Sequence, residues 1–182
     1  IEHIIVLKNN KGSEDNRVRK LDYSIQLSKL FYERFLKNED ISLFSPHDVP
    51  GLYDAFGTDE FDELYEKYER AYSVPKKKVN CQTLILELLK ERAETGRIYI
   101  MNIDHANSHS SFQDKINMSN LCQEITLPTK PIQSLHDTQG EIALCILSAI
   151  NVGILKDLDD LEELCDISVR ALDEIIDYQE YP

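Results

Sequence analysis

Residues 95–101 read TGRIYIM and join the end of a helical pattern to a short apolar run. Before them, apolar residues recur at helical spacing, which predicts a helix from about Pro75 that ends at Thr95–Gly96. After them, Ile98–Met101 places apolar side chains on both faces, as expected of a strand covered on both sides. A helix that leads directly into a buried strand is typical of the α/β class.

The same alternation of helical and apolar patterns continues in both directions along the chain. Further strands are predicted at Ile4–Leu7, Ile41–Phe44 and Ile142–Ile150, and further helices at about Asn16–Leu36, Asp59–Tyr72 and Asp157–Tyr178. Residues 121–127 are predicted to be extended, and the prolines at 128 and 131 end that segment. The whole pattern predicts an α/β fold in which at least some strands pair in parallel.

The last predicted helix has one acidic face and one apolar stripe. Between Asp157 and Asp177 it carries nine acidic residues and one arginine, as expected of a solvated face. The stripe predicted to be buried consists of Leu161, Leu164, Ser168, Leu172 and Ile175.

The composition excludes several classes of function. The chain has 182 residues, and its 20 Lys and Arg against 33 Asp and Glu give a net charge of −13, which repels nucleic acids and anionic membranes. No apolar run approaches the roughly 20 residues that a membrane-spanning helix needs. The four cysteines have no CxxC spacing and indicate reduced thiols of a cytoplasmic protein. Because the chain starts without Met and stops directly after a helical pattern, we expect a fragment of a longer protein.

Several possible sites have only weak support in the sequence. His105 and His109 are spaced to share a metal on one helix face, but their surroundings indicate a hydrogen-bonding loop and supply no third ligand. A Ser-His-Asp triad lacks the usual glycine-rich turn around its serine. On the residue pattern alone we expect Cys81 and Cys165 to be small apolar core or boundary residues, and Cys145 to be a buried structural thiol.

Cys122 lies in a more informative segment, residues 119–125, which read SNLCQEI. In an extended chain, Asn120, Cys122 and Glu124 would point to one side, with Leu121 and Gln123 facing away. An amide can orient a hydroxyl, a carboxylate can take its proton, and sulfur can do nucleophilic or one-electron chemistry. The same alternation also fits a half-exposed strand without function.

These residues and several other stretches resemble the large, catalytic subunit of class I ribonucleotide reductase. The similar stretches are SNLCQEI (119–125), LPTKP (127–131), GEIALC (140–145), LKNN (7–10), LFSPHDVPGLY (43–53) and TGRIY (95–99). They occur in the family's order and cover essentially the whole chain.

The resemblance implies a middle section of a ten-stranded α/β barrel. Residues 1–182 would be a fragment of that catalytic barrel domain, with no complete second domain and with a finger loop at about 117–127. Asn120, Leu121, Cys122, Gln123 and Glu124 would bind substrate, with no metal site in this segment.

The resemblance also implies a role for each catalytic residue. Cys122 would form the thiyl radical that removes the 3′ hydrogen of the substrate. Glu124 would be the base for the 3′ hydroxyl, and Asn120 would hydrogen-bond the substrate's hydroxyls. Cys145 would be one of two redox-active thiols, and its partner would lie outside this chain.

The implied function is the reduction of ribonucleoside diphosphates to deoxyribonucleoside diphosphates for DNA synthesis. Its implied partners are the rest of the large subunit, a small subunit with a metal-dependent radical, nucleotide effectors and a thioredoxin-type reductant. The isolated chain would then be inactive. The alternative is a non-catalytic acidic helical module that binds a protein partner, with every cysteine structural. The two differ in whether Asn120, Cys122 and Glu124 line one cavity.

Overall fold

The computed structural model describes residues 22–180. The chain divides after Glu141 into two compact units, each of which is described by itself. The predicted strand at Ile4–Leu7 and the start of the helix predicted at Asn16–Leu36 lie outside the described residues.

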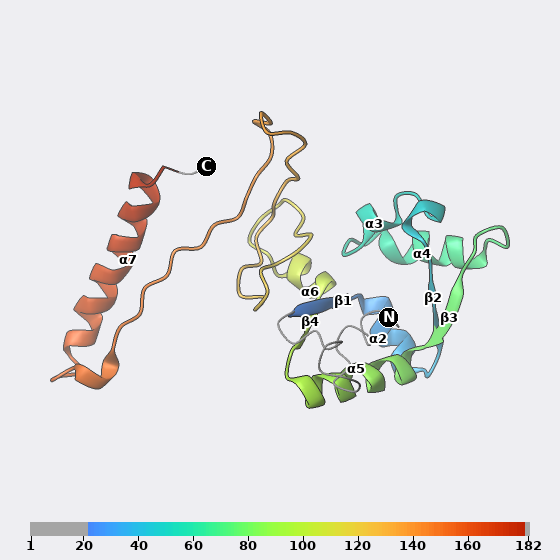
Figure 1. The fold of residues 1–182 in the computed structure, drawn as a ribbon, viewed down its shortest axis with the longest axis horizontal. Helices are drawn as coiled ribbons and strands as arrows, with labels where there is room; N and C mark the ends of the chain where they lie inside the picture. The colour runs from blue at the N-terminus through green and yellow to red at the C-terminus, as the bar shows by residue number, and fades with distance from the viewer. Residues whose placement is uncertain (1–21, 181–182) are drawn as a thin grey trace, which may run out of the picture. The chain divides into compact units, whose positions relative to one another are not determined.

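The first unit is a mixture of short helices and strands (Figure 1). In chain order they are β1 (Tyr23–Leu27), α2 (Lys29–Leu36), β2 (Asp40–Leu43), a 3-10 helix (Pro46–Asp48), α3 (Leu52–Ala55), α4 (Phe61–Arg70), β3 (Lys77–Asn80), α5 (Cys81–Thr95), β4 (Ile98–Asn102) and α6 (Ile103–Ser108). The α/β class and the predicted strands near Ile41 and Ile98 are therefore confirmed.

The strand that follows residues 95–97 pairs with the first described strand. β1 and β4 are parallel, in a register that pairs Ile25 with Ile100 and Leu27 with Asn102. Parallel neighbours need a crossover connection, and α5 lies within the one that joins them. This pairing confirms the predicted parallel strands.

β1 lies inside the region that the sequence pattern assigned to one helix. The helix α2 begins only at Lys29, because the Ser28 side chain caps it by accepting a hydrogen bond from the Phe31 N–H at 3.3 Å. Residues 23–27 gain a ladder of backbone hydrogen bonds with β4. Tertiary pairing therefore overrides the helical spacing of residues 16–36.

The helix predicted from Pro75 also starts later than expected. Residues 77–80 form β3, which pairs antiparallel with β2. Asn80 then caps α5, because its side-chain oxygen accepts a hydrogen bond from the Thr83 N–H at 3.1 Å. At the other end Gly96 adopts the left-handed conformation (φ 69°) that ends the helix, as predicted.

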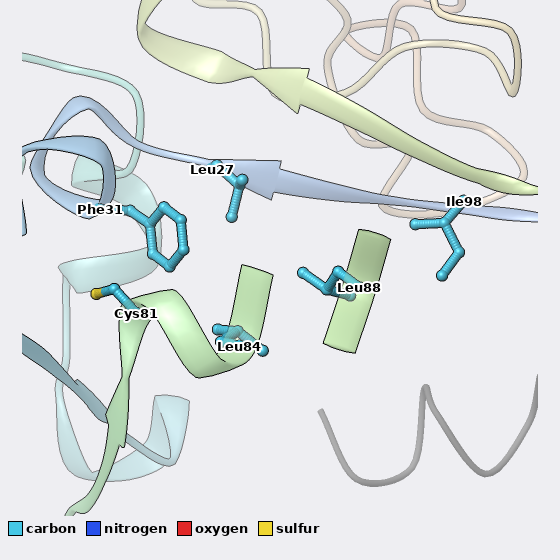
Figure 2. Packing of buried hydrophobic residues seen from close by; sticks show 6 residues of the cluster. All are labelled: Leu27, Phe31, Cys81, Leu84, Leu88 and Ile98. Carbon is cyan, nitrogen blue, oxygen red and sulfur yellow. The ribbon is translucent and has the colours of Figure 1, made fainter. Parts of the chain in front are cut away.

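The main core of this unit lies between α2, α5 and the β1–β4 pair (Figure 2). Figure 2 shows the side chains of β1, β4 and α5 pointing toward one another, and the buried residues are Leu27, Phe31, Cys81, Leu84, Leu88 and Ile98. Cys81 is fully buried, so its prediction as a core or boundary residue is confirmed.

A polar network joins α2, β2 and α4 beside that core. The two terminal nitrogens of Arg34 donate to the two carboxylate oxygens of Glu69 at 2.8 and 2.6 Å. The Ser42 hydroxyl donates to Glu69 at 2.8 Å, and the Tyr65 hydroxyl donates to the Ser42 carbonyl at 2.9 Å. Burial raises the pKa of Tyr65 to about 12.

The second unit contains a 3-10 helix (Val152–Ile154) and the long helix α7 (Asp160–Tyr178). Residues 142–150 were predicted to be a strand buried on both faces, and this is wrong for the described structure. No described strand pairs with them, and Ile142, Leu144 and Leu147 are exposed. The extended segment instead contacts α7, with the hydroxyls of Ser148 and Ser168 2.5 Å apart.

The predicted apolar stripe of α7 is only partly covered. Leu161, Leu164, Ser168 and Leu172 are half-buried, whereas Ile175 is 38% exposed. Cys165 on this helix and Cys145 before it are both exposed. The expectations that Cys145 is buried and that Cys165 is a core or boundary residue are therefore wrong within this chain.

Candidate functional site

The segment around Cys122 is a tight turn. The Gln123 N–H donates to the Asn120 carbonyl at 3.2 Å, and Gln123 has a positive φ of 68°. The prediction of an extended chain from Leu121 is therefore wrong at this point. Because a reverse turn and a left-handed residue interrupt the alternation of side chains, period-two spacing does not place Asn120, Cys122 and Glu124 on one side.

The side chain of Asn120 bonds to the residues after the turn. Its amide oxygen accepts a hydrogen bond from the Ile125 N–H at 2.9 Å. The backbone carbonyl of Asn120 also accepts from the Ser119 hydroxyl at 2.9 Å. An asparagine amide offers one acceptor oxygen and one NH2 donor group. With the oxygen used by the loop, the NH2 group is the part that is suited to donate to a ligand hydroxyl.

Cys122 lies on the turn and is exposed, and its thiol interacts with strand β4. The electrostatic interaction of the Tyr99 hydroxyl with Cys122, together with a hydrogen bond between the two side chains, raises the pKa of Tyr99. The sequence did not predict Tyr99 as a site residue, although Tyr99 ends the stretch TGRIY (95–99) that resembles the family. β4 pairs in parallel with β1, and Gln26 of β1 donates to the Asn117 carbonyl, so the strand pair is connected to this loop by contacts that local sequence spacing does not reveal.

The loop that leads to the turn is tied to the body of the first unit. Gln26 of β1 donates through its side-chain amide to the Asn117 carbonyl at 3.0 Å. Asn107 makes two bonds to Ile116: its oxygen accepts from the Ile116 N–H at 2.8 Å, and its nitrogen donates to the Ile116 carbonyl at 3.1 Å. Ile116 itself is 1% exposed. The long polar stretch after β4 is thus anchored, as expected of an ordered functional loop.

Glu124 and Cys145 complete the set of candidate catalytic residues. Glu124 is exposed directly after the left-handed Gln123. Cys145 belongs to the second unit, where its thiol is free and exposed. Leu121 at the tip of the turn is 44% exposed. The structure therefore gathers residues 119–125 and Tyr99 within one unit, and it describes Cys145 within the other.

His105 and His109 lie at α6, where the sequence pattern had indicated a loop. Residues 103–108 are helical, and the two imidazole rings meet edge to face with centroids 5.7 Å apart. The His109 Nδ1 atom lies 3.0 Å from the His105 carbonyl. Among residues 22–180, no three His, Cys, Asp or Glu side chains are grouped so as to hold a metal ion. Within that range no helix is long and apolar enough to cross a membrane.

Comparison with known proteins assigns this fold and loop to a class. The family model described as the ribonucleotide reductase barrel domain matches residues 1–182. The chain therefore belongs to the ribonucleotide reductase barrel-domain family.

Individual relatives carry a more specific name. The chain is 56% identical over 187 residues to the ribonucleoside-diphosphate reductase subunit alpha of Buchnera aphidicola subsp. Schizaphis graminum. This alignment covers 100% of the present chain and 24% of the relative. It is 55% identical over 186 residues to the subunit of that name from Haemophilus influenzae, covering 100% of this chain and 25% of the relative. With the subunit from Enterobacteria phage T4 the identity is 44% over 190 residues, with 100% and 25% coverage. The chain spans about a quarter of these relatives.

Proposed function

We propose that the chain is part of the catalytic barrel of a ribonucleoside-diphosphate reductase alpha subunit. The whole-chain match to the barrel-domain family, at up to 56% identity to subunits of that name, is the observation that carries the proposal. The parallel β1–β4 pair is consistent with a ten-stranded α/β barrel, of which residues 1–182 would form part. The finger loop at about 117–127 includes the turn that carries Cys122.

The reaction is the reduction of ribonucleoside diphosphates to deoxyribonucleoside diphosphates for DNA synthesis, in the cytoplasm. In this proposal the Cys122 sulfur, as a thiyl radical, takes the 3′ hydrogen of the ribose and later returns it. Glu124 takes the proton of the 3′ hydroxyl, which assists loss of the 2′ hydroxyl as water. Asn120 orients the substrate's hydroxyls through the NH2 group that its loop hydrogen bond leaves for a ligand.

Reduction at the 2′ carbon takes two electrons, which two thiols supply when they join in a disulfide. Cys145 is proposed as one of them, and its partner would lie in the part of the subunit beyond this chain. The small subunit would supply the radical, a thioredoxin-type reductant would reopen the disulfide, and nucleotide effectors would regulate the enzyme. Leu121 and Gln123 would contact the substrate through the same turn.

The rival proposal, a non-catalytic acidic helical module, has less support. Its main sequence feature is the acidic face of α7, which equally fits the solvated side of a helix in a larger enzyme. The family assignment covers every residue of the chain, so no part is left over for a separate interaction module.

The test is labelled CDP reduction by the full-length large subunit with its small subunit, effector and thioredoxin. Cys122→Ser should abolish deoxycytidine diphosphate formation, because an oxygen radical at that position is not accessible to the relay. Cys165→Ser is the matched control, since Cys165 is also exposed but lies on α7 and has no proposed role. Turnover by the Cys122→Ser enzyme at the control's rate would refute the radical assignment.

A further inference from the structure

Gln123, which follows Cys122, has a backbone conformation that its side chain does not favour. It is one of two non-glycine residues with positive φ in the part of the chain that the structure describes, the other being Asn38. Asparagine enters this left-handed region comparatively easily, whereas glutamine has no such tendency. A residue held there costs free energy, and such residues concentrate at functional sites.

Hydrogen bonds to the backbone and side chain of Asn120, and none from the Gln123 side chain, hold this conformation. On one side the Gln123 N–H donates to the Asn120 carbonyl, and two residues further on the Ile125 N–H donates to the Asn120 side chain. The Gln123 side-chain nitrogen is buried and has no hydrogen-bond partner among the described residues. A buried donor without an acceptor adds a cost of its own. The side chain therefore offers no bond that would offset the backbone strain.

We propose that the left-handed conformation of Gln123 positions the Cys122 sulfur for hydrogen abstraction, a role that rests on the proposed function. The conformation of residue 123 fixes the direction in which the chain leaves the turn, and so the angle between Cys122 and Glu124. Reaction at a bound ribose requires the sulfur to be close to one carbon–hydrogen bond, and a displacement of about 1 Å can cost about 100-fold in rate. Gln123 is thus a positioning residue.

A pair of isomeric substitutions separates backbone conformation from side-chain chemistry. In the full-length subunit with its small subunit, Gln123→Leu and Gln123→Ile both remove the amide and add the same atoms. Only isoleucine is β-branched, which makes the left-handed region much less accessible to it. Because Gln123 is also proposed to contact the substrate, the prediction concerns the ratio of the two variants: kcat for CDP should be about tenfold lower in Gln123→Ile than in Gln123→Leu, while the two should share any change in KM that loss of the amide causes. Gln123→Asn should have a higher kcat than Gln123→Ile, because asparagine tolerates positive φ.

A second readout distinguishes misplaced sulfur from general loss of structure. With CDP deuterated at the 3′ carbon, Gln123→Ile should show a larger isotope effect on kcat than the unaltered enzyme, because hydrogen abstraction becomes slower than the other steps. Loss of folding would lower the amount of active enzyme without changing that ratio. An unchanged isotope effect in Gln123→Ile would therefore overturn the proposal.

The outcomes also distinguish failure of the positioning role of Gln123 from failure of the proposed function. If Cys122→Ser is inactive while Gln123→Leu and Gln123→Ile have equal kcat, the positioning role is wrong and the proposed function stands. A loss in Gln123→Leu as large as that in Gln123→Ile would assign the effect to the amide and also overturn the proposal. Activity in Cys122→Ser would refute the radical role of Cys122, and with it the positioning role that rests on it.

Discussion

The ionised carboxylate of Glu69 accepts hydrogen bonds that join α2, β2 and α4 in the first unit. Its hydrogen bonds from Arg34, the largest cause, lower the pKa of the carboxyl group. A lowered folded-state pKa means that this contribution to stability is present above the pKa of the unfolded chain, about 4.3, and is lost as pH falls through the folded-state value.

We expect Glu69→Gln to lower the free energy of unfolding at pH 7 by about 1–3 kcal/mol, since it breaks a two-bond charged contact. Urea unfolding of the chain at pH 7 and at pH 3.5 measures the effect, which should shrink at the lower pH. Glu66→Gln removes an exposed ion pair with Arg70 one turn away and is the control. Equal losses in the two variants at pH 7 would contradict this assignment.

Cys81 differs from the other three cysteines in its burial. It is 0% exposed, and desolvation raises the pKa of its thiol. Because the thiolate is the reactive form, iodoacetamide at pH 8 should alkylate Cys81 at least about tenfold more slowly than Cys122, Cys145 or Cys165. Peptide mass spectrometry after timed quenching gives the four rates. Protection should vanish in urea, and persistent protection there would assign it to something other than burial.

The burial of Cys81 was predictable from the sequence, whereas the conformation of Gln123 was not. Cys81 recurs with Leu84 and Leu88 at the spacing of one helix face, so its pattern alone places it in the core. The positive φ of Gln123 depends on hydrogen bonds to Asn120. Glutamine has no intrinsic preference for the left-handed region, so its residue type does not predict this conformation. The chemical types at the candidate site were therefore predictable, but their geometry was not.

At the scale of elements, α5 depends on the cap that starts it. Asn80→Ala should lower the free energy of unfolding by about 1 kcal/mol, because the Thr83 N–H loses its side-chain acceptor. Asn80→Asp keeps a capping oxygen and should lose much less. Thermal denaturation followed by circular dichroism compares the two variants. A loss in Asn80→Asp equal to that in Asn80→Ala would show that the contact from the Asn80 NH2 group to Asn38 matters more than the cap.

The elements that the sequence pattern misplaced share one cause. β1 and β3 are short strands whose pairing partners are distant in the chain, so local spacing favoured the helices that follow them. Lys77 and Lys78 gave β3 no apolar alternation. By contrast α4 and β4 have strong local patterns and were found close to their predicted positions. The capping residues Ser28 and Asn80 mark where α2 and α5 begin, which the spacing of apolar residues did not show.

At the scale of the whole molecule, the second unit exposes side chains that a complete core would cover. Apolar residues are exposed both before and along α7, namely Ile142, Leu144, Leu147, Ile167, Val169 and Ile176. The chain spans about a quarter of the length of these relatives. The prediction of a buried strand at 142–150 was wrong because a run of apolar residues reports hydrophobicity and does not specify the strand or helix that would cover it.

The isolated 182-residue chain should not form deoxyribonucleotides, even with small subunit, effector and thioredoxin supplied. In the proposed route Cys145 would provide only one of the two thiols needed at the 2′ carbon, and the net charge of −13 gives no general attraction for a diphosphate. Labelled CDP reduction by the isolated chain and by the full-length subunit measures this difference. The full-length subunit should turn over and should lose activity in Cys145→Ser, since no disulfide can then form. Turnover by the isolated chain would show that the site needs nothing beyond these residues, contrary to the proposed two-thiol route.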